Sequence, residues 1–498
     1  RNWSMPAPEP PVRSLTSRLS VRAALLMSTA GYGLMALWFP LRPNIAVSPP
    51  ADIRTFAPTL LAGIAYMALV VTQFALLVIA FRQAERERAD ARPLLFILAG
   101  GLLLALPLLW AYPVNATDIF GYVIRGRIAG VYGESPFSVP AATFVGDPFM
   151  PLVGEWAGLT TPYGPLWELP AAGLMAISGD NLLLSVLLFK GLALVAFLAT
   201  TTLIWSLLPV GTGRAAYTLL WAWNPGLLLT FILDGHNDAV MIFWLVLGFW
   251  VARRGRPTVG FLVMILAVLT KPVAVLALPF FFIREWRDLP NNRARAHFTG
   301  ATVVGSALLT WLAFLPWAGE GETLRAPLEL ALRLVREATG GAGFSPAVWV
   351  YMVLGRRISI ETIGAVTQAL FAAFALWLVW LGFRGRSALR GAADIFFGYL
   401  AGALNFRIWY AAWPFPWLLL DAGSASGNDA ERTAYRLRVG LWFLLLTQLS
   451  VVVYGHIRVF ALGGDQALAH LLGVPIVFGL PWLLALLPPH LSRPVHDA

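Results

Sequence analysis

Apolar runs long enough to cross a lipid bilayer recur along nearly the whole chain of 498 residues. A helix needs about 20 apolar residues to span a hydrocarbon core roughly 30 Å thick. With 58% hydrophobic residues, 12% charged residues and a mean hydropathy of +0.71, a soluble fold would expose large apolar patches. We therefore expect an all-α, polytopic membrane protein, in which residues 1–498 form one integral unit with roughly twelve or thirteen membrane helices.

The charge and composition exclude several classes of partner and site. The formal net charge of +10 could indicate nucleic-acid binding, but the Arg residues cluster in short loops between apolar runs, as the positive-inside rule requires. We therefore expect no nucleic-acid partner. The chain has no Cys, which excludes disulfides and Cys-based metal sites, and its six His residues lack HExxH spacing. We expect neither a metal site nor another cofactor.

Arginines orient the first part of the chain. The polar segment 1–20 carries Arg13 and Arg18 ahead of a retained first helix, so we place this segment in the cytoplasm. The loop of residues 82–92 is Arg-rich and is also expected to be cytoplasmic. The first three helices are expected near residues 21–39, 58–81 and 94–111, and they deliver residues 112–161 to the extracytoplasmic side.

The number of crossings after this external loop must be odd, because the next Arg-rich loop, residues 253–256, should be cytoplasmic. Four apolar stretches lie in between. We expect the short stretch after Pro165 to be re-entrant or partly interfacial, and the remaining three to cross at residues 181–208, 215–233 and 239–252. This assignment places Asp234 and Asp238 on the same side as Asp118.

The second half of the chain contains a proline break and a second external region. Lys271-Pro272 divides residues 257–283 into two short helices that dip into the membrane and return. Residues 318–345 are expected to be external and to include an interfacial helix at 324–335. Further helices are expected near residues 298–317, 360–383, 392–404, 413–420, 439–454 and 471–487, with a polar cytoplasmic loop at 423–438.

Asp118 is the first candidate for chemistry. Tyr122, Arg125 and Arg127 follow it at helical spacing, so a short interfacial helix is expected to begin there with Asp118 near its N-terminus. An Asp in this position is a common helix cap. A carboxylate beside a water–lipid boundary can also act as a general base toward a hydroxyl group. Spacing alone leaves both roles open.

Three ionisable residues, Asp234, His236 and Asp238, lie together between two apolar stretches. Such residues are costly near a bilayer and usually mark a functional site or a water-filled cavity, although a hydrated turn is the alternative. We favour a functional site because these residues are expected to share a side with Asp118. His236 is a candidate phosphate ligand, and a carboxylate here could hold a metal weakly.

Three cations lie within or beside apolar runs, where each needs an anionic partner or a route to the interface. Snorkelling accounts for Lys190 as well as a function does, and Lys271 precedes the proline break. Arg407 offers a planar fork suited to phosphate. The aromatic residues that follow it, Trp409 and Tyr410, suit either sugar stacking or an interfacial aromatic belt.

Five motifs occur in a definite order: DIFGYVIRGR from Asp118, TPYGPLW from Thr161, GHND from Gly235, KPVAVLALPFFF from Lys271 and RIWYAAWPFP from Arg407. The Tyr163-Gly164-Pro165 segment within the second motif requires an unusual turn. Together these motifs resemble those of the bacterial polyprenyl-phosphate-mannose-dependent α-mannosyltransferases of the GT-C superfamily. The resemblance extends from about the third helix to the late aromatic motif.

The resemblance implies a GT-C-like bundle, a lipid-linked sugar donor and an inverting transfer at the extracytoplasmic face of the cytoplasmic membrane. Asp118 matches the first-loop acid of this family and would take the proton from the acceptor hydroxyl, while Arg407 would stabilise the departing phosphate. The residues expected to bind substrate are Arg125, Tyr163, His236, Asn237, Asp238, Lys271, Arg407, Trp409 and Tyr410.

The expected activity is hexosyl transfer, with mannose moving from a polyprenyl phosphate to a glycolipid or glycan acceptor. A multi-pass transporter or flippase of lipid-linked sugars is the main alternative, and a protein that only binds a lipid or a partner is a third. A transporter should carry interrupted helices at corresponding positions of two halves, whereas the sequence shows one broken pair without a counterpart. The acid-bearing external loop favours the enzyme.

Overall fold

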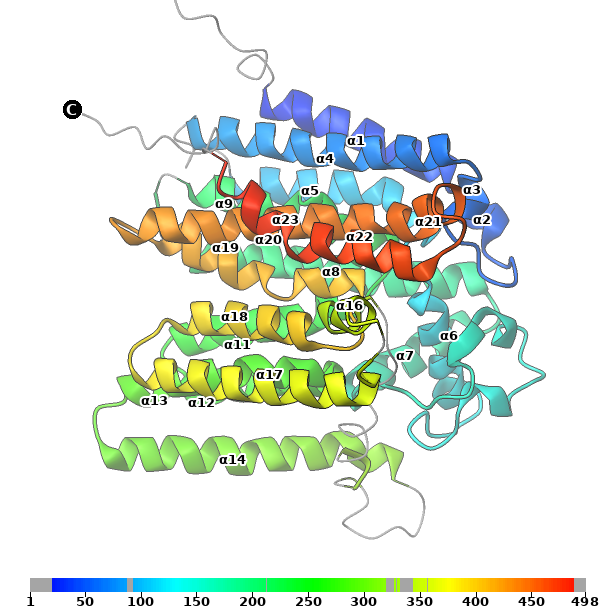
Figure 1. Cartoon of the computed structure of the whole chain (residues 1–498). Coiled ribbons are helices and arrows are strands. Elements are labelled where there is room, and N and C mark those ends of the chain that lie inside the picture. The colour runs from blue at the N-terminus through cyan, green and yellow to red at the C-terminus, as the bar shows by residue number, and fades with distance from the viewer. Residues whose placement is uncertain are drawn as a thin grey trace, which may run out of the picture.

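The computed structural model describes residues 20–86, 93–211, 213–318, 327, 329–331, 344–355 and 357–487. Long helices lie side by side in one bundle, and a lobe of short helices and loops, residues 112–164, covers one end (Figure 1). Within the described residues no strand forms, and the only bridges are Pro40 with Ala111 and Phe344 with Phe406. The prediction of an all-α polytopic membrane protein is confirmed.

Seven helical segments of the described residues are long and apolar enough to cross a membrane. They are α4 (Leu60–Arg86), α8 (Leu182–Leu207), α9 to η5 (Arg214–Leu233), α14 with η7 (Asn292–Trp317), α17 (Ile360–Phe383), α20 to α21 (Asp429–Phe460), and α22 with α23 (Gln466–Leu484). Shorter helices lie among them: α1 (Val21–Trp38), α5 (Leu94–Leu109), α11 (Asp238–Arg253), α12 (Pro257–Thr270), α13 (Leu278–Asp288), α18 (Ala388–Gly402) and α19 (Phe415–Ser424). The total of twelve or thirteen crossings stays a prediction.

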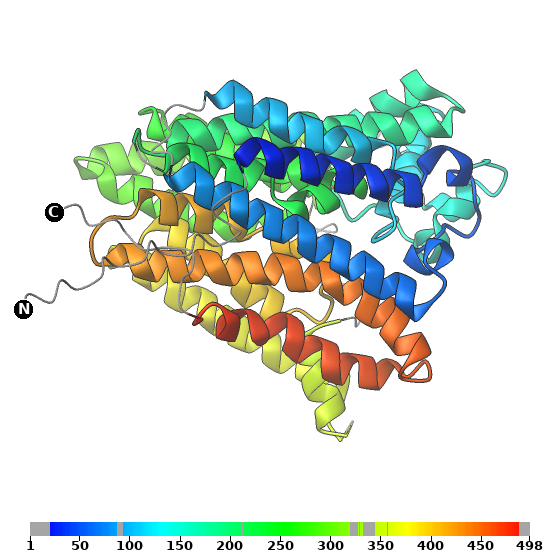
Figure 2. The same ribbon diagram turned by 90° about the horizontal axis from the view of Figure 1, so that it is seen from above.

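The helices differ in how much protein surrounds them. The segment Arg214–Leu233 is 94% buried within the protein, whereas the membrane-length windows of α14 and α17 are 17% and 11% buried. In Figure 2, α4 lies between α1 and α20, and it contacts both. The continuous core therefore runs through the middle of the bundle, and the apolar surfaces of α14 and α17 suit contact with lipid.

Two of the three crossings predicted after the first external loop correspond to the membrane-length segments α8 and Arg214–Leu233. The third, at 239–252, coincides with α11, whose 16 residues are fewer than in those segments, and its crossing stays a prediction. The preceding helix α7 (Pro165–Ser178) has 14 residues, too few to cross a bilayer of normal thickness alone. The backbone N–H of Asn115 donates a hydrogen bond to Asp234 Oδ1 at 3.3 Å. The turn that contains Asp234 therefore lies beside the loop that leads to Asp118, as expected.

The predicted polar loop at 423–438 is wrong for most of its length. Helix α20 already begins at Asp429, with Asp429 and Glu431 in its first turn, where acidic side chains favour a helix N-terminus. Arg390 on α18 pairs with Asp421 and Asp429, and Asp394 pairs with two arginines, one of them on α20. The charged residues that suggested a loop instead form ion pairs that join α18, α19 and α20 at this end of the bundle. The predicted helix at 324–335 and the cytoplasmic segment 1–20 lie almost wholly outside the described residues.

A close backbone contact fixes the start of α7. The N–H of Gly164 donates to the carbonyl of Thr270 at 3.1 Å, at the end of α12. A Cβ atom on Gly164 would lie 2.0 Å from the Leu269 carbonyl oxygen, so only glycine permits this approach. Gly164 itself has an ordinary extended backbone, so the glycine is required by this close contact and not by the unusual turn expected at Tyr163-Gly164-Pro165.

We predict that Gly164→Ala lowers the apparent melting temperature in detergent, because overpacking against rigid backbone costs roughly 1–3 kcal/mol. Gly173→Ala on the same helix is the matched control, since a Cβ there meets nothing within 4 Å. Alanine also favours a helix over glycine. Equal melting temperatures for Gly164→Ala and wild type, measured by intrinsic fluorescence, would contradict the contact.

Candidate functional site

Asp118 is the first residue of helix α6 (Asp118–Gly130), and Thr117 rather than Asp118 occupies the N-cap. No hydrogen bond joins the Asp118 carboxylate to the described backbone, so the capping role considered from the sequence is not seen. Asp118 keeps part of its surface accessible, whereas the next ten residues of α6 are buried. A carboxylate that is partly exposed but surrounded by buried residues can act as a general base.

The charges around Asp118 set its proton affinity. Asp118 lies outside the membrane-length helices, and burial raises its pKa above the ordinary Asp value. Lys271, Arg407 and Arg125, in that order, oppose this rise because each cation favours the ionised carboxylate. A partly dehydrated carboxylate is therefore held close to three positive charges drawn from distant parts of the sequence.

Lys271 and Asp238 form a buried ion pair at the centre of the site. Lys271 Nζ lies 2.9 and 2.8 Å from the two carboxylate oxygens of Asp238, and it also contacts Asn237 Oδ1 at 3.4 Å. The indole N–H of Trp413 donates to Asp238 Oδ1. The aromatic face of Tyr163 lies 5.7 Å from the same ammonium group. One ion pair thus brings together the turn before α11, the break after α12, the start of α7 and the late aromatic motif.

The helix break predicted at Lys271-Pro272 explains how Lys271 reaches Asp238. Helix α12 ends at Thr270, Lys271 is extended, and η6 (Pro272–Ala277) begins the returning segment. Proline cannot continue the hydrogen-bond ladder, so the chain leaves the helix at this point. The break places the lysine side chain in the interior instead of on a helix face.

His236 packs flat against Trp409, with ring centroids 4.1 Å apart. Its Nδ1 lies 3.5 Å from the hydroxyl of Tyr122 and 4.0 Å from Asp238 Oδ2. Burial, followed by the charge of Lys271, lowers the pKa of His236 well below its ordinary value, so the ring is neutral. A neutral imidazole can donate or accept a hydrogen bond at the site without adding charge.

Three buried polar atoms in this turn have no hydrogen-bond partner within the described residues: Asp234 Oδ2, His236 Nε2 and Asn237 Nδ2. Buried polar groups are almost always paired, and an orphaned one calls for a specific explanation. The two nitrogen atoms belong to residues that lie beside the Lys271–Asp238 pair. They are the polar positions that a bound substrate could satisfy.

Arg125 and Arg407 supply two further cations. The guanidinium of Arg125 lies 5.8 Å from the ring centroid of Tyr163, and that of Arg407 lies 5.4 Å from the ring of Trp156. Among the described residues neither arginine forms an ion pair with a carboxylate. Neither charge is therefore neutralised by a direct ion pair, although Arg125 is buried. The ring of Tyr410 lies 5.5 Å from Lys271 Nζ at the same site.

The structure brings the predicted site residues together around Asp118. Contacts join Tyr163, His236, Asn237, Asp238, Lys271, Trp409 and Tyr410 in one cluster, and the charges of Arg125 and Arg407 act on Asp118. The aromatic residues after Arg407 face this cluster, which argues against a role only in an interfacial belt. Whether they bind substrate stays a prediction, as does the expected absence of a metal and of other cofactors.

The snorkelling explanation is wrong for Lys190, which lies behind the turn that contains Asp234 and Gly235. Its side chain is fully buried and donates to the carbonyls of Leu108 and Ala111 at 3.1 and 2.6 Å. These carbonyls lie at the end of α5, where a helix leaves acceptors unsatisfied. Lys190 therefore fixes the point at which the chain leaves α5 and turns toward Asp118.

Asn115 also holds the segment before Asp118 in place, and the sequence analysis did not identify it. Asn115 contacts three different segments: its N–H bonds to Asp234, its side-chain oxygen accepts from Tyr66 at 3.0 Å, and its amide nitrogen lies 3.5 Å from Gln448 Oε1. Gln448 in turn donates to Thr230 at 3.1 Å. No local pattern indicates these contacts, because their partners come from α4, η5 and α20. The network holds the segment directly before Asp118.

The sequence of residues 18–286 matches the family model described as "Alpha-(1->6)-mannopyranosyltransferase, N-terminal domain". This match covers more than half of the chain and includes Asp118, the His236 turn and Lys271. The chain belongs to this family. Arg407 and the aromatic residues after it lie beyond the matched residues.

The chain is also similar in sequence to individual proteins of this family. The chain is 28% identical over 337 residues to alpha-(1->6)-mannopyranosyltransferase A of Mycobacterium tuberculosis, covering 62% of each protein. It is 27% identical over 203 residues to the enzyme of that name from Corynebacterium glutamicum, covering 40% of this chain and 41% of the relative. A probable alpha-(1->6)-mannopyranosyltransferase of Mycolicibacterium smegmatis is 25% identical over 387 residues, or 73% of this chain and 61% of the relative. The chain thus spans less than two thirds of the length of these relatives.

We predict that Lys271→Met is strongly destabilising, because it leaves the Asp238 carboxylate buried without its cation, at a cost of about 3–5 kcal/mol. The double variant Lys271→Met/Asp238→Asn should recover part of this loss, since it removes the unpaired charge while Asn keeps an acceptor for Trp413. A double-mutant cycle of melting temperatures in detergent measures the coupling. Strictly additive effects would show that the two side chains do not depend on each other.

Proposed function

We propose that this protein is a membrane mannosyltransferase that moves mannose from a polyprenyl-phosphate donor to a glycolipid or glycan acceptor at the extracytoplasmic face of the cytoplasmic membrane. Membership of the α-(1→6)-mannopyranosyltransferase family supports the sugar and the reaction class. The observation that carries the proposal is the partly accessible Asp118 carboxylate among Lys271, Arg407 and Arg125. Such an arrangement offers a base for a hydroxyl group and cations for a phosphate within one site.

The proposed reaction is a single displacement. Asp118 accepts the proton of the acceptor hydroxyl as its oxygen forms a bond to C1 of mannose, while the bond from C1 to the phosphate oxygen breaks and polyprenyl phosphate leaves. One displacement inverts the configuration at C1. An α-linked product therefore requires a β-linked mannosyl phosphate as donor.

The cations have a separate task in this scheme. Negative charge grows on the phosphate oxygen as the bond to C1 breaks, and a fixed cation stabilises that charge most strongly where water is excluded. Arg407 and Arg125 are the candidates for this contact because neither pairs with a described carboxylate, whereas Lys271 is engaged by Asp238. His236 and Asn237 would orient the sugar hydroxyls through their orphaned nitrogen atoms.

Transfer of radiolabelled mannose from polyprenyl phosphate mannose to lipid acceptors tests the base. Asp118→Asn should reduce the rate about 10²-fold or more, as loss of a general base usually does. Glu134→Gln is the matched control, since Glu134 is an exposed acid of the same loop. Full activity of Asp118→Asn would remove Asp118 from the mechanism. If wild type transfers no sugar but moves the lipid-linked sugar across vesicle membranes, the flippase alternative replaces the enzyme.

The pH dependence of kcat/KM tests the surrounding charges. Asp118 must be ionised to act as base, so activity should fall as the pH drops through its raised pKa. Arg407→Gln removes a cation that favours the ionised form. We therefore predict that the acidic limb of the profile moves to higher pH, in addition to any loss of rate. Arg42→Gln, at an exposed position, should leave the limb in place, and an unmoved limb in Arg407→Gln would contradict the charge coupling.

A further inference from the structure

Helix α7 carries a buried acid that has no role in the mannosyl-transfer scheme. Glu168 lies in the first turn of α7 and is 1% exposed. A carboxylate removed from water is costly unless hydrogen bonds and a cation compensate its charge. The contacts of Glu168 therefore indicate what this acid does in the interior.

One oxygen of Glu168 is held by the chain segment that leads into α7. The Thr161 hydroxyl donates to Glu168 Oε1 at 2.5 Å, and the oxygen of the same hydroxyl accepts the N–H of Tyr163 at 3.1 Å. The N–H of Thr161 donates to the carbonyl of Pro136 at 2.9 Å. Glu168 is thereby fixed to the backbone of the Tyr163 segment, which lies beside Lys271 in the site.

The second oxygen of Glu168 has no such contact. Within the described residues Oε2 is buried and has no hydrogen-bond partner. Arg125 on α6 is the cation whose charge acts on Glu168. Its guanidinium forms no ion pair with a carboxylate of the described residues. The two opposite charges therefore act on each other without direct contact.

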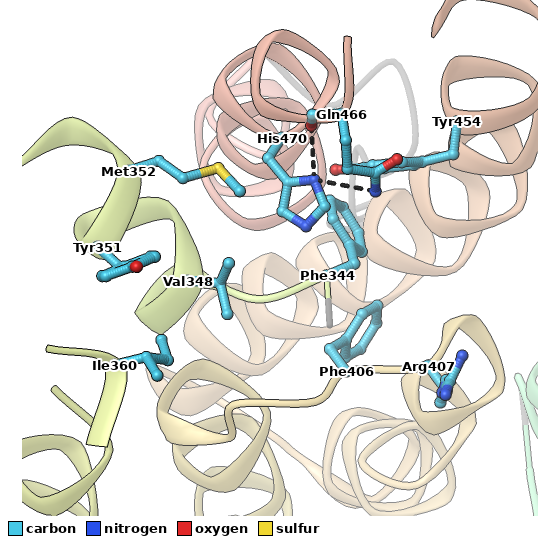
Figure 3. A pocket seen from close by; sticks show the side chains of 10 residues that line it. All are labelled: Phe344, Val348, Tyr351, Met352, Ile360, Phe406, Arg407, Tyr454, Gln466 and His470. Atoms are coloured by element: carbon cyan, nitrogen blue, oxygen red, sulfur yellow. Dashed lines mark hydrogen bonds between the residues drawn. The ribbon is translucent and has the colours of Figure 1, made fainter. Parts of the chain in front are cut away.

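The two candidate cations for the phosphate differ in their surroundings. Arg407 lines a half-open pocket of about 470 Å³, together with Phe344 and Tyr454 (Figure 3). Water that enters this pocket can compensate the charge of Arg407. Arg125 is only 6% exposed, and its guanidinium lies 5.8 Å from the ring centroid of Tyr163. A cation buried in this way depends on carboxylates of the protein for its compensation.

We propose that Glu168 is a positioning residue of the sugar-transfer site, which compensates the charge of Arg125 and leaves the guanidinium N–H groups to the phosphate of the substrate. The assignment deepens the proposed function and rests on its use of Arg125 as a phosphate contact. A carboxylate in direct contact would occupy those N–H donors. An acid held farther away by Thr161 compensates the charge and leaves the donors unused.

Double variants test whether Glu168 acts through Arg125. Glu168→Gln removes the charge but keeps an oxygen that can accept the Thr161 hydroxyl. We expect it to lower kcat/KM for mannosyl transfer about ten-fold in the wild-type background but less than about two-fold in the Arg125→Gln background. Glu134→Gln, at an exposed position, is the matched control and should have no effect in either background. Equal losses in both backgrounds would indicate a structural role and overturn the proposal.

The pH dependence of stability provides a second test, because Glu168 lies outside the membrane-length helices. Burial raises its pKa to about 7, although Thr161 and Arg125 act in the opposite direction. The folded protein therefore binds this proton more tightly than the unfolded chain does, and stability is lost as the pH rises toward 7. Glu168→Gln should raise the melting temperature in detergent, more at pH 8 than at pH 5, while activity falls. Stabilisation that does not grow with pH would overturn the proposal.

The melting temperatures also separate failure of this proposal from failure of the proposed function, since they need no substrate. Arg125→Gln removes the cation that favours ionised Glu168, so Glu168→Gln should stabilise that background more at pH 8 than it stabilises wild type. Gel filtration checks that each variant is folded. Equal stabilisation in both backgrounds would overturn the coupling of the two charges even if wild type transfers mannose. The predicted difference in a protein that transfers no sugar would support the coupling and refute the transferase.

Discussion

The buried pair of Lys271 and Asp238 is the interaction on which the rest of the site depends. A charge taken out of water is costly unless a partner and further hydrogen bonds compensate it. Here Asp238 receives both Lys271 and the indole of Trp413, and Lys271 also touches Asn237. These contacts can form only if three separated parts of the chain meet. The need to pair these two charges therefore brings the turn before α11 and the helix break after α12 together at the site.

The position of Asp118 follows from contacts made outside its own helix. Lys190 binds the end of α5, Asn115 is held by Asp234, and the start of α7 is joined to the end of α12 through Gly164. A catalytic charge is most effective when its surroundings are already arranged and need not reorganise during the reaction. The supports behind Asp118 provide such an arrangement.

The sequence predicts the general features because membrane insertion imposes strong, local rules. Apolar length identifies helices such as α4 and α17, and the proline after Lys271 identifies the break. The expected grouping of Asp118 with Asp234 and Asp238 followed from counting crossings alone. Each of these inferences depends on residues that are adjacent in the chain or on a simple parity argument.

Other features could not be predicted because they depend on distant partners. The polar residues from Asp429 onward resemble a loop until Arg390 is seen to pair with Asp429. Lys190 resembles a snorkelling lysine until the carbonyls at the end of α5 are placed beside it. The pocket at Arg407 joins Phe344 to Tyr454, residues that no local pattern connects.

A structure of the protein in lipid nanodiscs with a non-transferable C-glycoside analogue of polyprenyl phosphate mannose would show where the donor binds. We predict that the phosphate lies against Arg407 or Arg125, and that C1 of the sugar is within reach of a hydroxyl group bound at Asp118. A phosphate bound at the opposite end of the bundle, among the arginines near Arg390, would contradict it.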